Sequence, residues 1–216
     1  SSVITVVLVA VLAVLTLALA WPRLRAALTF LPVEAAIERY HLDHQPPYAA
    51  LDDLIVRAGR SATLQPQQRY WSGLVLLHYL QANDATRPLY AQRESYEAAA
   101  AAADASLALA PVQPRTWLYR SLALGWLSFR DTGLAESFKA SVYTGRVEPA
   151  LLLTRMRLGY ARLGQLDAEA RGLLRDQTLL AWRLQEREFT VALRRGELDL
   201  RRMAAVLTPA DAPLLQ

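Results

Sequence analysis

The sequence contains few side chains whose type and spacing could support catalysis. Its three histidines are His41, His44 and His78, and the first two flank Asp43 at a spacing that could hold a divalent metal. Two prolines follow at once, and no second ligand pair stands at zinc-site spacing, so we interpret the segment as a solvated loop. His78 lies in the apolar stripe of a predicted helix, where we expect a half-buried packing residue. We therefore predict no metal site.

Paired carboxylates are another common source of acid–base chemistry, and two pairs occur here. Glu34 and Glu38 lie one helical turn apart, while Glu186 and Glu188 alternate with arginine. We interpret both pairs as solvated helix faces with ion pairs. The chain has no cysteine, and it lacks a glycine-rich phosphate loop, a nucleophile elbow and an HExxH motif. This pattern favours a protein that is not an enzyme and needs no cofactor.

Arginine and tryptophan side chains could instead contact another protein. Lys139 is the sole lysine among many arginines, and arginine suits bidentate contacts to carboxylates. The candidate partner-binding residues are arginines that flank predicted helices and apolar residues beside them: Arg115, Leu118, Leu122, Trp126, Arg155 and Arg162. Ordinary solvated arginines are the alternative. Tryptophans at helical spacing are expected mainly in the core; these are Trp71, Trp117, Trp126 and Trp182.

The composition limits the class of protein that can position these residues. Of 216 residues, 53% are hydrophobic, 20% are charged and 8% are aromatic, which is too hydrophobic for a disordered chain. The 24 basic and 20 acidic residues leave a net charge of +4. This charge is too small and too evenly spread for a nucleic-acid surface. We therefore predict a folded protein with no nucleic-acid partner.

An apolar segment near the start is typical of a membrane anchor. From Val3 to Ala20 the sequence contains only Val, Ile, Leu, Ala and two threonines. As a helix it would be about 27 Å long, close to the hydrocarbon thickness of a bilayer. The residues expected at the membrane interface follow it: Trp21, Arg23 and Arg25. We predict a transmembrane anchor over 1–25, with a signal peptide cleaved after Ala18-Leu19-Ala20 as the alternative.

Two opposing signals bear on the orientation of this anchor. Arg23 and Arg25 would hold the following domain in the cytoplasm if the positive-inside rule acted alone. A single hydrophobic segment before one large domain is, however, the usual arrangement of a signal anchor, which exports the domain. We expect a single-pass protein of the bacterial inner membrane whose helical domain lies in the periplasm.

Beyond the anchor, apolar residues recur at three- and four-residue spacing, and no run has the period of a strand. Pro32 is expected to open a short helix that ends near Tyr40. Pro46-Pro47 predicts a break, after which a helix should run from Tyr48 to Arg57 with Gly59 as its C-terminal cap. These patterns predict an all-α fold.

From Pro66 onward the predicted helices come in pairs of about 35 to 45 residues, the period of a helical repeat array. The segment from Leu107 to Trp117, with its two prolines, resembles the junction between tetratricopeptide repeats. Ala135, Phe138 and Pro149 fall near the small, aromatic and proline positions of such a repeat. Each pair would expose an apolar face that only stacking can bury.

The predicted fold is therefore a single N-terminal transmembrane helix followed by a tetratricopeptide-like stack of antiparallel helix pairs. Asp167 is expected to cap a helix that ends near Leu184. The final, less regular pair should cover 187–194 and 198–207. The expected ranges are the anchor at 1–25, linker helices at 26–65, the repeat domain at 66–207 and a C-terminal tail at 208–216.

Two stretches carry a resemblance to a known family. The first is Leu31-Pro-Val-Glu-Ala-Ala-Ile-Glu-Arg39, and the second extends from Thr144 through Gly159 and Asp167 to Leu184. Together they resemble the VpsP-type accessory proteins of bacterial exopolysaccharide gene clusters. The resemblance implies an anchored helical scaffold, without catalytic residues, in exopolysaccharide biosynthesis or export.

We therefore expect a non-catalytic interaction protein. Its partners would be other membrane-protein subunits, bound through the anchor and the helical domain, together with the lipid bilayer. The alternative is an accessory structural subunit of another inner-membrane complex, such as a respiratory or a secretion assembly.

Overall fold

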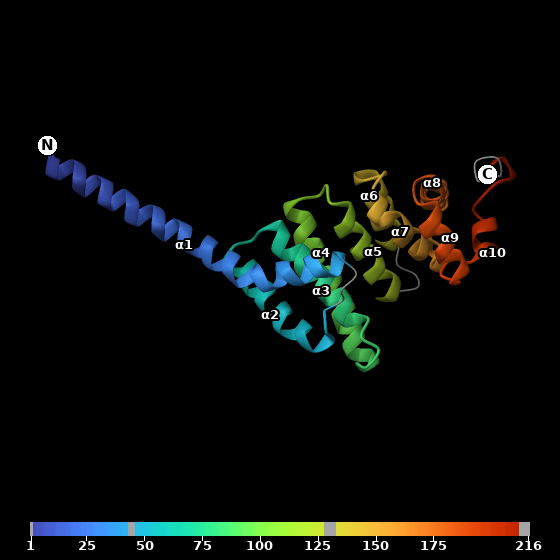
Figure 1. Ribbon diagram of the computed structural model, residues 1–216, viewed down its shortest axis with the longest axis horizontal. Coiled ribbons are helices and arrows are strands. Elements are labelled where there is room, and N and C mark those ends of the chain that lie inside the picture. Colours follow the sequence, from blue (N-terminus) through green and yellow to red (C-terminus); the bar gives the residue numbers. More distant parts are fainter. Residues whose placement is uncertain (1, 43–45, 128–132, 212–216) are drawn as a thin grey trace.

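The computed structural model describes residues 2–42, 46–127 and 133–211. All regular secondary structure in these ranges is helical, which confirms the predicted all-α class. The first helix is α1 (Ser2–His41), and Figure 1 shows the others following it in order along the molecule. They are α2 (Tyr48–Leu64), α3 (Gln68–Ala82), α4 (Leu89–Leu109), α5 (Pro114–Leu127), α6 (Gly133–Thr144), α7 (Pro149–Ala161), the 3-10 helix η1 (Leu163–Gln165), α8 (Ala168–Leu184), α9 (Glu186–Arg194) and α10 (Leu200–Ala204).

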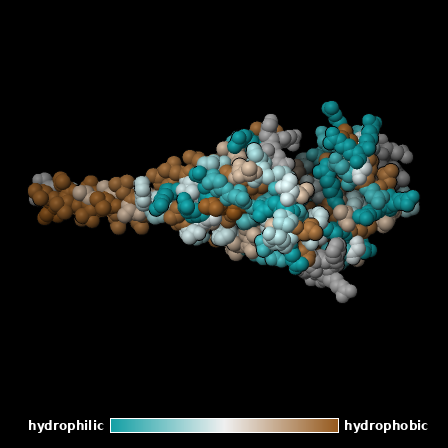
Figure 2. All heavy atoms as spheres, turned by 90° about the horizontal axis from the view of Figure 1, so that it is seen from below, coloured by the Kyte–Doolittle hydropathy of each residue, from teal (hydrophilic) through white to brown (hydrophobic). Residues whose placement is uncertain are grey.

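The first half of α1 projects from the body as a rod (Figure 1). Every side chain from Val3 to Trp21 is exposed, and Figure 2 shows this rod as a nearly continuous apolar surface. Thr16 Oγ1 donates a hydrogen bond to the carbonyl of Leu12 (2.7 Å), so this hydroxyl is satisfied without water. The helix contains an 18-residue stretch with a mean hydropathy of 3.0. By length and composition, α1 could therefore cross a membrane.

Helix α1 continues through both of its prolines. We expected Pro32 to open a new helix, and this expectation is wrong, because Pro22 and Pro32 both lie inside α1. An internal proline removes a backbone donor and crowds the carbonyl four residues earlier. Packing offsets this cost in the second half of α1, where Ala26, Phe30 and Val33 are buried.

The second half of α1 belongs to the body. It shares one hydrophobic core with α2, α3 and α4. The rings of Phe30 and Tyr70 lie 4.8 Å apart, and Ser61 Oγ of α2 donates to the carbonyl of Ala26 (3.0 Å). The range 26–65, where we expected linker helices, thus packs in the same core as the first helices of the expected repeat domain.

Other helix boundaries agree with the sequence to different degrees. Asp167 caps α8 as predicted, because its Oδ1 accepts the N–H of Ala170 (2.7 Å). The predicted end of α2 is wrong, since Gly59 lies inside the helix and α2 continues to Leu64. The last helix, α10, is also shorter than the expected 198–207.

The helices pack mainly in chain order, and the odd-numbered ones also contact one another. Helix α1 packs on α2, α3 on α4, α5 on α6, and α7 on α8. Contacts of α1 with α3, of α3 with α5 and of α5 with α7 join the odd-numbered helices into one layer. A second hydrophobic core extends from α5 to α10. The layer of odd-numbered helices positions the site described next.

Candidate functional site

Two cavities lie between α5 and α7, one at the beginnings of the two helices and one at later turns. The first cavity, of about 440 Å³, is lined by the beginnings of both helices and the end of α1: Tyr40, His41, Arg115, Leu118, Tyr119, Ala150, Leu151 and Thr154. The second, of about 190 Å³, is lined by later turns of both helices: Leu122, Trp126, Arg157, Leu158, Ala161 and Arg162. Because the beginnings share one cavity and later turns the other, α5 and α7 run in the same direction. We call these two cavities together the α5–α7 groove.

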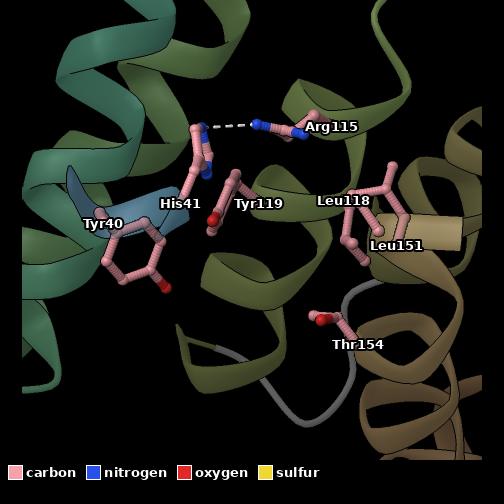
Figure 3. Close-up of a pocket in the computed structure, with 8 residues that line it drawn as sticks. Tyr40, His41, Arg115, Leu118, Tyr119, Leu151 and Thr154 are labelled. Atoms are coloured by element: carbon pink, nitrogen blue, oxygen red, sulfur yellow. Dashed lines mark hydrogen bonds between the residues drawn. The ribbon is translucent and has the colours of Figure 1, made fainter. Parts of the chain in front are cut away.

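The polar centre of the first cavity is a contact between α1 and α5 (Figure 3). Arg115 Nη1 lies 2.7 Å from His41 Nε2, as Figure 3 shows. A guanidinium can only donate, so the imidazole accepts at Nε2 and carries its proton on Nδ1. Burial, and after it the charge of Arg115, lowers the pKa of His41 below its usual value of 6.5. At neutral pH this pair therefore presents one positive charge, that of Arg115.

Tyrosines form the wall of the first cavity opposite α7. The rings of Tyr119 and Tyr79 lie 5.1 Å apart, and the Tyr119 phenol also interacts with Tyr40. Burial, more than these neighbouring phenols, raises the pKa of Tyr119 far above its usual range. The hydroxyl therefore stays protonated and cannot serve as a base near neutral pH.

The second cavity is organised around an exposed tryptophan. The Trp126 ring stacks on Tyr96 at 5.6 Å with an interplanar angle of 10°, and Arg162 Cζ lies 5.4 Å from the Trp126 centroid. Trp126 is nevertheless 59% exposed, so the expectation that it lies in the core is wrong. An aromatic side chain that is held in place by a tyrosine and a guanidinium and is still largely exposed is typical of protein-binding surfaces.

Five of the six candidate partner-binding residues line the α5–α7 groove. Arg115 and Leu118 belong to its first cavity, although Leu118 is almost fully buried, and Leu122, Trp126 and Arg162 belong to the second. They share a groove because residues at three-, four- and seven-residue spacing on a helix share a face. The helix that ends near Tyr40 was predicted, but the contribution of Tyr40 and His41 to the first cavity was not, because it depends on the packing of the end of α1 beside α5.

The sixth candidate, Arg155, is not on the surface. Its side chain is fully buried, so the expectation that it flanks a binding face is wrong. It donates hydrogen bonds to the carbonyls of Ser141 (2.6 Å) and Gly145 (2.9 Å), to Ser141 Oγ (3.0 Å) and to Gln177 Oε1 (2.8 Å). Burial lowers the pKa of Arg155 to about 10. Arg155 thus links α6, α7 and α8 as a structural cation.

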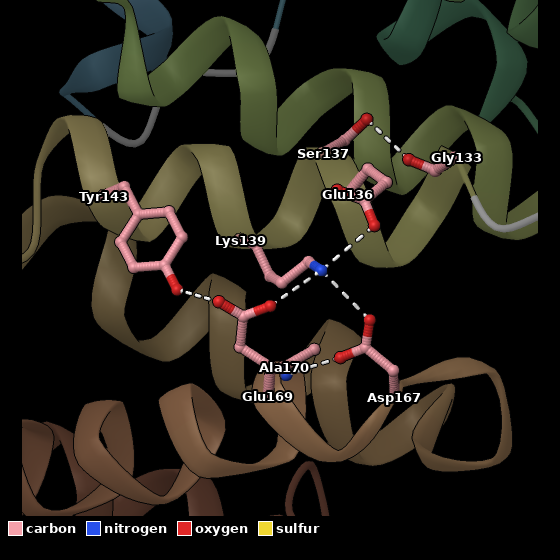
Figure 4. A network of polar contacts seen from close by, with 8 residues as sticks. All are labelled: Gly133, Glu136, Ser137, Lys139, Tyr143, Asp167, Glu169 and Ala170. Atoms are coloured by element: carbon pink, nitrogen blue, oxygen red, sulfur yellow. Dashed lines mark hydrogen bonds and ion pairs between the residues drawn. The ribbon is translucent and has the colours of Figure 1, made fainter.

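Lys139, the sole lysine, holds α6 against the start of α8 (Figure 4). Its Nζ lies 3.0 Å from carboxylate oxygens of Glu136, Asp167 and Glu169. Tyr143 also donates to Glu169. Hydrogen bonds with these three carboxylates raise the pKa of Lys139 well above its usual value, so the amine stays charged. The cluster is a polar clamp between two helices and has no free base for catalysis.

The other residues considered for chemistry do not converge. Within the described ranges no group of three His, Cys, Asp or Glu residues is placed to hold a metal. Asp43 and His44 lie outside the described residues. His78 is half-buried, as expected, and burial lowers its pKa. Both pairs of glutamates, at 34 and 38 and at 186 and 188, are exposed on helices.

No protein family, curated protein or solved structure that we compared with the chain matches it. The features of this chain that bear on its function are therefore the α5–α7 groove and α1.

Proposed function

We propose that this chain is a non-catalytic, membrane-anchored interaction protein whose α5–α7 groove binds another protein. The observation that carries the proposal is the pairing of an apolar helical rod with a groove that holds an exposed aromatic anchor and an arginine at opposite ends. Tethering on one membrane raises the effective concentration of two partners, so even a weak contact in the groove would be occupied.

We infer further that the body is a tetratricopeptide-like stack. Support comes from the packing of successive helices against one another and from the contacts that join α1, α3, α5 and α7 in one layer. In a stacked array of this kind one layer of helices forms the extended binding surface. The α5–α7 groove lies in that layer.

The chemistry of the groove supports recognition rather than catalysis. It offers one guanidinium and the protonated hydroxyl of Tyr119 in the first cavity, and apolar walls in the second. The acceptor atom of His41 is already engaged by Arg115. The first cavity is the more polar of the two and the second is mainly apolar. Polar groups beside apolar walls fix the orientation of a bound segment, and the positive charge favours an acidic one.

For the setting, we propose the bacterial inner membrane, with the body in the periplasm and a role in exopolysaccharide biosynthesis or export. The basis is the resemblance of the 31–39 and 144–184 stretches to the VpsP-type accessory proteins, together with the apolar rod of α1.

The side of the membrane on which the body lies can be tested because the chain has no cysteine of its own. Arg171→Cys places one thiol on an exposed position of α8. A maleimide that cannot cross the inner membrane should label it in cells whose outer membrane has been permeabilised.

The central experiment is affinity purification from membranes solubilised in several mild detergents. We expect the chain to recover proteins of polysaccharide synthesis or export, and Arg115→Ala and Trp126→Ala to lose at least part of this recovery. Arg171→Ala removes an arginine outside the groove and should leave recovery unchanged. Recovery of the chain without any other protein in every detergent would contradict the proposal. Recovery of respiratory or secretion subunits would replace the proposed setting with another complex.

A further inference from the structure

Beyond the apolar rod, α1 has two apolar faces, and the body covers only one of them. The covered face consists of Ala26, Phe30, Val33 and Ala36, all buried. The other face carries large apolar side chains that remain about half exposed or more: Trp21 (62%), Leu24 (51%), Leu28 (56%) and Leu31 (53%). At roughly 100° per residue, the centres of the two faces are about half a turn apart. The uncovered face therefore points away from the body.

The uncovered residues have the spacing of a coiled-coil seam. Trp21, Leu24, Leu28, Leu31 and the exposed Ala35 are separated alternately by three and four residues. In heptad terms, Trp21, Leu28 and Ala35 occupy a positions, while Leu24 and Leu31 occupy d positions. We call these five residues the α1 seam. Such a seam packs against another helix by inserting each side chain between four residues of its partner.

Lipid cannot cover the outer part of the α1 seam. Leu31 follows Ala20, the last residue of the apolar run, by eleven residues in an unbroken helix. At 1.5 Å per residue it lies about 16 Å beyond the hydrocarbon core, whereas the interfacial layer is only about 5–8 Å thick on each side. Beyond the reach of lipid, only another protein surface would remove these apolar side chains from water.

A second copy of the chain provides a complementary seam. Two copies anchored in one membrane have the same orientation, so their α1 helices would pair in parallel. In a parallel coiled coil, a residue at g faces the residue at e of the next heptad in the partner helix. Glu34 occupies a g position and Arg39 the following e position, and both side chains are exposed. Glu34 of each helix would therefore pair with Arg39 of the other helix, which gives two symmetric ion pairs. The bodies would lie on opposite sides of the pair, because each packs on the face remote from its seam.

We propose that the chain forms a parallel homodimer through the α1 seam. This goes beyond the proposed function, from which it takes only the shared membrane orientation. The dimer would display two α5–α7 grooves from one membrane site.

Cysteine cross-linking tests the dimer in membranes, and the chain has no native thiol to interfere. Leu24→Cys and Leu28→Cys each place a thiol in the seam. Arg23→Cys, also exposed, is the matched control on a different face of the same helical turn. Copper phenanthroline with oxygen removes two electrons and two protons from a pair of thiols and joins them as a disulfide. We expect a covalent dimer from both seam variants and several-fold less from the control.

A charge exchange tests the register. Glu34→Arg should weaken the dimer about three- to tenfold, since it replaces two exposed attractive pairs with repulsive ones. Combining it with Arg39→Glu should restore the dimer. Equal cross-linking at positions 23, 24 and 28, no cross-linking at any of them, or seam cross-links only to a different protein would overturn the proposal. Membrane-bound protein that stays monomeric would also overturn the proposed dimer, and it would leave the proposed anchor and the α5–α7 groove unaffected.

Discussion

Arginine side chains have three different roles in this molecule, and the role of each depends on where the fold places it. Arg115 offers its charge in a cavity, Arg162 covers one side of an exposed indole, and Arg155 is sealed inside the body. Removing a buried cation is costly, because the acceptors around it lose their donors and stay away from water. Burial therefore determines which arginine substitutions should affect folding.

We expect Arg155→Met to lower the free energy of unfolding by about 3 kcal/mol, since it leaves four oxygen acceptors without these donors. The matched control is Arg157→Met on the same helix. Arg157 is 46% exposed and pairs with Glu197 at the surface, so its loss should cost less than about 1 kcal/mol. Urea unfolding in mild detergent, followed by tryptophan fluorescence, measures both. Equal effects of the two substitutions would refute the structural role of Arg155.

The pKa of His41 should lie below 6.5 in an NMR titration of its ring protons. Burial is the larger cause and Arg115 the smaller, so Arg115→Met should raise this pKa only part of the way to its usual value. The folded chain binds fewer protons at His41 than the unfolded chain between the lowered pKa and 6.5. Stability contributed by His41 is therefore present above pH 6.5 and is lost as the pH falls through this window. A wild-type pKa of 6.5 or higher would contradict the Arg115 contact.

Much of the candidate site was predictable at the level of single residues. Helical periodicity places Arg115, Leu118, Leu122 and Trp126 along one side of a single helix, and this could be read without a structure. The burial of Arg155 could not, because its acceptors come from helices that precede and follow its own. The sequence likewise indicated that Trp126 lies in a helix. It did not show which side of α5 the neighbouring helices cover, and so it did not show whether Trp126 is buried.

At the scale of the elements, a close contact between α7 and α8 depends on a missing side chain. A Cβ at Gly159 would lie 2.6 and 2.9 Å from the two methyl carbons of Leu174, which is fully buried. Leu174 has little room to move in a close-packed core. Gly159 therefore permits the close approach of the two helices.

Gly159→Ala should destabilise the body by about 1–3 kcal/mol through overpacking. Gly172→Ala is the natural counterpart, since a Cβ there meets nothing within 4 Å on the exposed side of α8. It should stabilise the body by about 0.5–1 kcal/mol through helix propensity alone. Thermal unfolding followed by circular dichroism measures both changes in stability and distinguishes a destabilised variant from a stabilised one. A stabilising Gly159→Ala would show that α7 and α8 are not in close contact there.

Most helices were predictable from apolar spacing, proline and caps, and the errors have a shared cause. Pro32 and Gly59 are residues that usually end helices, yet each lies inside one. Their local preferences amount to a few kcal/mol at most. Burial of neighbouring side chains such as Phe30 and Ala62 outweighs them, and the sequence does not show which neighbours will be available.

At the scale of the whole molecule, the body should depend on only part of α1. A chain that begins at Arg23 keeps the covered face of α1, whereas a chain that begins at Tyr48 loses it. Burying each large apolar side chain contributes about 1.5–3 kcal/mol, and a domain is stable by only about 5–15 kcal/mol in total. We expect the longer chain to fold and the shorter one to unfold or aggregate, as measured by circular dichroism and gel filtration. Equal folding of both would show that residues 26–41 are dispensable.

The unbroken course of α1 from the apolar rod into the core has a mechanical consequence. In the proposed anchored state no flexible joint separates the membrane span from the body, so a tilt of the span would move the body with it. A tilt of about 20° would displace a point 30 Å along the axis sideways by about 10 Å. The interfacial side chains and the helix packing that set this tilt would thereby determine how far from the membrane, and at what angle, the α5–α7 groove meets its partner.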